Sequence, residues 1–128
     1  MDNFSYLGAL VGAVAFFVLG AIWYSALFRK PWMSDMGIDP NTPPQKPASA
    51  MLLGSGVAAL VVAGVIEFIV RDAGVGFGAC RGTIVGAAMA AAIGQNAFYD
   101  TRPRRLGIIN GAYVLVGGLL VGAIAGAL

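Results

Sequence analysis

Few side chains in this sequence of 128 residues could take part in catalysis. It contains no histidine and one cysteine, Cys80, so it lacks the residues of most metal, haem and histidine-dependent sites and cannot form an internal disulfide. Its serines have no histidine that would activate them as nucleophiles. The sequence therefore predicts a protein that is not an enzyme and holds no cofactor or metal, with lipid chemistry by Glu67 or Asp100 left open.

Glu67 is the one acidic residue that stands inside a long apolar run. Arg71 follows four residues later and is therefore expected on the same helix face. We expect an ion pair at the membrane interface, or a carboxylate that reaches the water, and keep a proton- or cation-binding site as the alternative. The same face carries Gly56, Leu60 and Gly64, so the Glu67 side chain is expected to point toward another helix.

A second polar group lies near the ends of two other apolar runs. It consists of Gln95, Asn96, Asn110 and Tyr113. If these two runs form antiparallel neighbouring helices, the four side chains reach the same depth and can form hydrogen bonds between helices, each contributing on the order of 1 kcal/mol. We favour this structural role, with a binding or permeation site open to the cytoplasm as the alternative.

Glycines recur at four-residue spacing in the apolar runs. Small residues at this spacing form a groove along one helix face, which lets a neighbouring helix approach closely. The candidate helix-packing or partner interface consists of Gly82, Gly86 and Gly94 in one run and Gly118, Gly122 and Gly126 in another. We favour packing within the bundle over pairing of the last ridge with another protein, and the two can coexist.

The apolar residues that carry these groups fall in runs long enough to cross a membrane. The sequence is 59% hydrophobic and 11% charged, with a mean hydropathy of +0.82. Spanning a bilayer takes about 20 apolar residues, and such runs occur at residues 4–28, 48–70, 82–99 and 106–128. We predict an all-α membrane protein, a four-transmembrane-helix bundle that forms a single domain over residues 1–128.

The basic residues predict how this bundle is oriented. The loops at 29–47, which is rich in proline, and at 100–105 hold six of the eight Lys and Arg residues, whereas Arg71 and Arg81 lie on the other side. By the positive-inside rule, these two loops are cytoplasmic and both termini face outward, on the periplasmic side. Aromatic anchors expected at the cytoplasmic boundary are Trp23, Tyr24, Trp32 and Tyr99.

Two further patterns concern the connections. Pro31 suits the first turn of a helix and Gly37 suits its left-handed end, so a short interfacial turn is expected between them. The first and third runs both end in a tyrosine followed by Arg and Pro. This likeness suggests that the chain consists of two parallel-repeat hairpins.

Two stretches resemble a known family. Residues 20–33, GAIWYSALFRKPWM, resemble the first-helix signature of the DUF1761 family of small bacterial membrane proteins. The motifs Asn96-x-x-Tyr99-x-x-Arg102-Pro103 and Ile109-Asn110-Gly111-x-Tyr113 are similar to its third-to-fourth-helix segment. The resemblance implies four helices in a bacterial cytoplasmic membrane. It supplies no mechanism, because the family has no established activity.

These observations lead to two functional hypotheses. The first is a non-enzymatic protein that packs through Gly-rich helix faces, as a homo-oligomer or as an accessory subunit of a larger membrane complex. The second is a small oligomeric channel or transporter for an ion or small solute. The expected partners are the lipid bilayer and transmembrane helices, and no nucleic acid, because the basic residues cluster between apolar runs.

Overall fold

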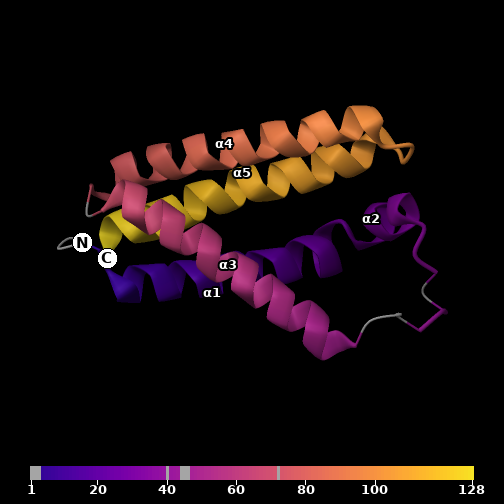
Figure 1. The fold of residues 1–128 in the computed structure, drawn as a ribbon, viewed down its shortest axis with the longest axis horizontal. Helices are drawn as coiled ribbons and strands as arrows, with labels where there is room; N and C mark the ends of the chain where they lie inside the picture. The colour runs from indigo at the N-terminus through magenta and orange to yellow at the C-terminus, as the bar shows by residue number, and fades with distance from the viewer. Residues whose placement is uncertain (1–3, 40, 44–46, 72) are drawn as a thin grey trace.

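The computed structural model describes residues 4–39, 41–43, 47–71 and 73–128, and this part of the chain is helical and contains no strand (Figure 1). Its long helices are α1 (Tyr6–Ile22), α3 (Ala48–Val70), α4 (Val75–Tyr99) and α5 (Arg104–Ala127). A π-helical turn, η1 (Trp23–Leu27), extends α1, and a short helix, α2 (Arg29–Met36), follows it. Four segments are long and apolar enough to cross a membrane: Tyr6–Leu27, α3, α4 and α5. The prediction of an all-α chain with four such helices is confirmed.

The predicted start of the third long helix, at residue 82, is wrong. Helix α4 already begins at Val75. The predicted runs left residues 71–81 as a connection, but a Cβ at Gly78 would lie 3.0 Å from the Cα of Gly126 on α5. The absence of side chains therefore allows close contact between two helices. The helix begins directly after its N-cap, Gly74, whose positive φ of 91° is one that glycine adopts easily.

Helix α5 is the centre of the bundle. It packs against α4, α1 and α3, and its contact with α4 is the most extensive in the molecule. Figure 1 shows α4 and α5 side by side along their whole length, whereas α3 crosses α1 obliquely. The two pairs of helices are therefore packed differently. Their relation as repeats, like the orientation of the termini, stays a prediction.

The buried core extends from the middle of the bundle toward the end where α1 begins and α5 ends, which we call the terminal end (Figure 1). It is formed by small and branched side chains, including Ala13 and Phe16 of α1, Ala63 and Ile66 of α3, and Val121 of α5. We call the opposite end, which carries α2 and the connection between α4 and α5, the α2 end. The first half of α3 reaches this end without joining the core.

Helix α2 confirms the short helical turn predicted between Pro31 and Gly37. It spans eight residues, and Gly37 ends it with φ 71° and ψ 26°, the left-handed conformation that glycine adopts most easily. Pro31 lies in its first turn, where a missing N–H costs no helical hydrogen bond. Helix α2 lies over the α2 end of the bundle and contacts α5.

Candidate functional site

The π-helical turn η1 directs two aromatic side chains toward α5. One extra residue per turn changes the direction of the side chains that follow α1, and such turns are frequent at functional sites. Trp23 donates a hydrogen bond from Nε1 to the carbonyl oxygen of Ile109 at 3.1 Å, and Tyr24 donates from its hydroxyl to Oδ1 of Asn110 at 2.7 Å. A regular helix over residues 4–28 was predicted. The π-helical turn replaces the last part of that helix, and its two hydrogen bonds connect the end of the helix to α5.

Tyr113 completes an aromatic cluster beside these hydrogen bonds. Its ring centroid lies 4.9 Å from that of Phe16 and 5.3 Å from that of Tyr24. Its hydroxyl donates to the carbonyl oxygen of Phe16 at 3.3 Å. Gly20 makes room for it, because a Cβ there would lie 2.9 Å from the Tyr113 hydroxyl oxygen. The cluster is a polar and aromatic joint between α1 and α5.

The predicted group of four polar residues is therefore only half assembled. Asn110 and Tyr113 meet through Tyr24, one of the expected membrane anchors. Gln95 and Asn96 are exposed on α4 and line two different hollows beside the α4–α5 connection. Asn110 lines one of these hollows together with Asn96, but its hydrogen bond goes to Tyr24 of η1.

The other predicted anchors differ in their surroundings. Trp32 packs its ring against Tyr24, with centroids 5.3 Å apart, so it belongs to the aromatic cluster. Tyr99, at the end of α4, is 84% exposed. Trp23 and Tyr24 are half-buried and bound into the protein. Their hydrogen bonds give them a structural role in addition to any contact with lipid headgroups.

An ion pair between α2 and α5 was not predicted from the sequence. Asp35, whose side chain is 3% exposed, accepts two hydrogen bonds from Arg105, from Nε at 2.8 Å and from Nη2 at 2.7 Å. The hydrogen bonds from the Arg105 guanidinium hold the pKa of the Asp35 carboxyl below its ordinary value. This two-point contact fixes α2 on the end of the bundle.

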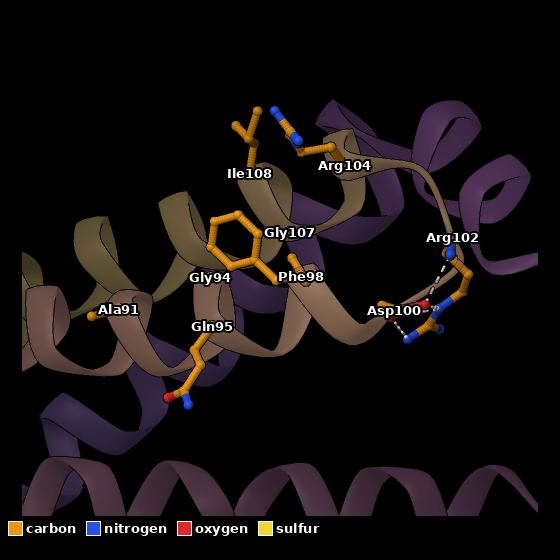
Figure 2. A pocket seen from close by; sticks show the side chains of 10 residues that line it. Ala91, Gly94, Gln95, Phe98, Asp100, Arg102, Arg104, Gly107 and Ile108 are labelled. Carbon is orange, nitrogen blue, oxygen red and sulfur yellow. Dashed lines mark hydrogen bonds and ion pairs between the residues drawn. The ribbon is translucent and has the colours of Figure 1, made fainter.

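A second ion pair closes the connection between α4 and α5. Arg102 contacts Asp100 with 2.6 Å between Nη2 and Oδ2, and its backbone N–H also donates to this carboxylate. These hydrogen bonds lower the pKa of Asp100 to about 2. Asp100 therefore neutralises the charge of Arg102. Figure 2 shows the pair at the edge of a groove beside α4 and α5.

Glu67 lies at the opposite, terminal end of the bundle and is fully buried. Its Oε1 accepts a hydrogen bond from the backbone N–H of Ser5, the N-cap of α1, at 3.1 Å. Its Oε2 has no hydrogen-bond partner among the described residues. A Cβ at Gly8 would lie 2.7 Å from Oε2, so the carboxyl occupies the space that a side chain at residue 8 would fill.

The expected ion pair between Glu67 and Arg71 is not formed. Arg71 ends α3 in the left-handed conformation, with φ 45°, which takes it off the helical face. Its Nε donates to the carbonyl oxygen of Phe68 at 2.8 Å, and its guanidinium lies 4.1 Å from the Phe68 ring centroid. The i,i+4 argument fails here because it applies only while both residues remain helical.

The expected neighbours of Glu67 on its own helix face are also wrong. Leu60 is 52% exposed, and a Cβ at Gly56 or Gly64 would contact nothing within 4 Å. The buried face instead follows residues four apart, Ala59 and Ala63, and then Ile66 and Val70. Both rows are spaced by four residues and lie near Glu67 on the helix, and it is the row of Ala59 and Ala63 that packs into the core of the bundle.

The glycine faces bring α4 and α5 into backbone contact. Gly78, Gly82 and Gly86 are buried against α5, and Gly118, Gly122 and Gly126 are buried against α4. A Cβ at Gly122, for example, would lie 2.8 Å from the Cα of Gly82. The favoured interpretation, packing within the bundle, describes what these faces do in the structure. Gly94 is different, because a Cβ there would meet nothing within 4 Å.

The architecture and the contacts above define a multi-pass helical membrane protein by the length and composition of its four long helices. A model of the family described as "Protein of unknown function (DUF1761)" matches residues 7–126, nearly the whole chain. The chain therefore belongs to the DUF1761 family, as the resemblance of its motifs predicted. No similar curated protein and no similar solved structure was found.

Proposed function

We propose that this protein is a non-enzymatic assembly subunit of the bacterial cytoplasmic membrane, and that it associates with copies of itself or with a larger membrane complex through the first half of α3. One observation carries the proposal: this half contains no buried residue. The buried residues of α3 begin at Ala59. Residues 48–58 are exposed, apart from the half-buried Gly56.

The exposed half of α3 has a face suited to another helix. Ala50, Gly54 and Ala58 are exposed and follow one another at four-residue spacing. A Cβ at Gly54 would contact nothing within 4 Å. In a bilayer the hydrophobic effect does not drive helices together, so van der Waals contact along such a smooth ridge favours association. The three residues form what we call the α3 ridge.

The α3 ridge supports association better than the α5 glycines do. Gly118, Gly122 and Gly126 lie against α4, so a partner could reach them only if α4 moved away. We therefore assign the proposed assembly face to α3, whose exposed small residues do not pack against another described helix as the α5 glycines do. No rearrangement of the bundle is required for a partner to contact Gly54.

The proposal includes an orientation with the α2 end in the cytoplasm. Arg29 and Lys30 lie at the start of α2, and three further arginines lie between residues 102 and 105. Arg71 and Arg81 are the basic residues of the terminal end. The positive-inside rule favours this orientation. The α3 ridge then lies in the cytoplasmic half of the membrane.

The test is the mass and composition of particles extracted from native membranes in lipid nanodiscs. We expect either several copies of this chain or other subunits at fixed stoichiometry, and we expect Gly54→Leu and Ala58→Leu to reduce the particle to one chain. Ala88→Leu, at an exposed position of α4, is the matched control and should leave the mass unchanged. A wild-type particle with one copy and no other protein would refute the proposal.

The second candidate, a small oligomeric channel or transporter, is favoured by the buried carboxyl of Glu67. Its Oε2 is without a partner among the described residues, and an unpaired acidic oxygen inside a membrane span is a reason to consider proton or cation binding. Flux into liposomes discriminates the two functions. Loss of flux in Glu67→Gln with an unchanged oligomer would favour transport, whereas no flux in the wild type would remove this candidate.

A further inference from the structure

The groove shown in Figure 2 is a feature that the proposed assembly does not use. It has a volume of about 740 Å³ and lies beside α4 and α5 at the α2 end. Gly94 of α4 forms an open floor, because a Cβ there would meet nothing within 4 Å, whereas Gly107 of α5 lines the groove close to Ala97. Phe98 and Ile108 form apolar walls, and they are 81% and 66% exposed.

The open floor distinguishes this groove from the rest of the interface between α4 and α5. Toward the terminal end the glycines of the two helices fill one another's grooves, and a Cβ at Gly86 would lie 2.6 Å from the carbonyl oxygen of Val114. At Gly94 the space is empty within 4 Å. An apolar chain can therefore lie on α4 here without displacing any described side chain.

The groove has a positive charge at its mouth that the described residues do not neutralise. Of the three arginines near the start of α5, Arg102 is paired with Asp100 and Arg105 with Asp35. Arg104 lines the groove and forms no ion pair with a described residue. Figure 2 shows Arg104 and Ile108 rising from α5 on the same side, whereas Gln95 points away from them.

We propose that this groove binds one anionic phospholipid, with its phosphate on the Arg104 guanidinium and an acyl chain on the glycine floor between Phe98 and Ile108. The groove joins the end of two membrane-crossing helices to the polar connection, which is the depth at which a lipid changes from headgroup to hydrocarbon. The planar guanidinium can donate two parallel hydrogen bonds to phosphate oxygens. Basic pockets between transmembrane helices are suited to such headgroups.

The two parts of the site can be removed separately. Arg104→Gln removes the charge and keeps a polar side chain, while Gly94→Leu fills the floor and leaves the charge in place. Gly94→Leu is compatible with the fold because nothing lies within 4 Å of its Cβ position. The matched control is Arg29→Gln, which removes a basic residue that lines a different hollow, beside Met33 and Ile38.

The experiment is a titration of the purified protein with phosphatidylglycerol, in which native mass spectrometry counts the bound lipids. We expect one tight site in the wild type and in Arg29→Gln. Its affinity should fall about tenfold in Arg104→Gln, as expected for the loss of a charge-assisted contact, and should also fall in Gly94→Leu. Phosphatidylcholine should bind as weakly to the wild type as phosphatidylglycerol does to Arg104→Gln.

Three results would overturn the proposal. Equal affinity for phosphatidylglycerol and phosphatidylcholine would mean that the charge of the headgroup is not recognised. Competition of glycerol phosphate at the affinity of the whole lipid would mean that the site takes a soluble anion and that the groove contributes nothing. Wild-type affinity in Gly94→Leu would place the tight lipid elsewhere on the protein.

Discussion

The contact between Glu67 and the start of α1 predicts a specific rescue of stability. In a capping box, a Ser at the N-cap is followed three residues later by a Glu that accepts from the backbone N–H of the N-cap. Here Ser5 is the N-cap, and its hydroxyl oxygen accepts from Gly8 N–H at 2.9 Å. Residue 8 is a glycine, and Glu67 of α3 supplies the missing carboxylate from a distance of 62 residues in sequence.

This arrangement gives the magnitudes expected for three variants. Glu67→Ala removes the cap of the Ser5 N–H, about 1 kcal/mol, and leaves a cavity in a fully buried position, at least about 1 kcal/mol more. Glu67→Gln keeps the volume and an accepting oxygen, so it should cost about 1 kcal/mol or less. Gly8→Glu in the wild type places a Cβ 2.7 Å from Oε2 of Glu67 and should also destabilise.

The decisive variant combines the two changes. In Gly8→Glu/Glu67→Ala, the new side chain stands three residues after Ser5 and can complete the capping box within α1, while the clash with Glu67 is gone. We expect Gly8→Glu to lower the free energy of unfolding in the wild type and to raise it by about 1 kcal/mol in Glu67→Ala. The measurement is reversible unfolding in mixed micelles with increasing sodium dodecyl sulfate, followed by circular dichroism.

A double-mutant cycle isolates this coupling from the effects of each single change. If Gly8→Glu destabilised both backgrounds equally, Glu67 would not act as the cap of α1. The buried carboxyl would then need another explanation, and the transport hypothesis would gain weight. If the rescue is observed and the double variant also keeps its flux, Glu67 is a structural residue.

Two further predictions concern the close helix contact and the ion pair at the α2 end. Gly122→Ala should destabilise the protein by at least about 1–3 kcal/mol, because its Cβ would lie 2.8 Å from the Cα of Gly82, whereas Gly64→Ala, with nothing within 4 Å, should be tolerated in the same unfolding assay. Arg105 holds the pKa of Asp35 below its ordinary value, so the pair contributes stability above about pH 4 and loses it as the pH falls further. Asp35→Asn should be less stable than the wild type at neutral pH, and the difference should shrink in acid titrations below pH 4. A constant difference across that range would contradict the assignment.

The fold was predictable where the signal lies within one segment. The four long apolar runs, and the small helix that ends at Gly37, depend on length, hydropathy and a left-handed glycine, all of which can be read locally. The start of α4 was not predicted because glycines such as Gly78 are compatible both with a loop and with a closely packed helix. In water they favour a loop, whereas inside a membrane they allow a second backbone to approach.

The contacts of the candidate sites were less predictable, because each depends on which helices become neighbours. Asn110 was expected to form hydrogen bonds with amides of α4, but the π-helical turn η1 brings Tyr24 to it, and the hydrogen bond goes to the Tyr24 hydroxyl. Asp35 and Arg105 are 70 residues apart, and their pairing requires α2 to fold over the end of α5. No spacing in the sequence encodes either contact.

The partner of a glycine ridge is also unpredictable from sequence, because it depends on which helix becomes its neighbour. A row of small residues indicates that a helix can be approached closely, and it is equally compatible with an approach from the same chain or from another one. In the structure, the rows of small residues on α4 and α5 pack against each other. The α3 ridge has the same spacing, but its three residues are exposed and do not belong to the buried face of α3. We propose an intermolecular contact for this ridge, and Gly54→Leu tests the proposal at a position where a Cβ would meet nothing within 4 Å.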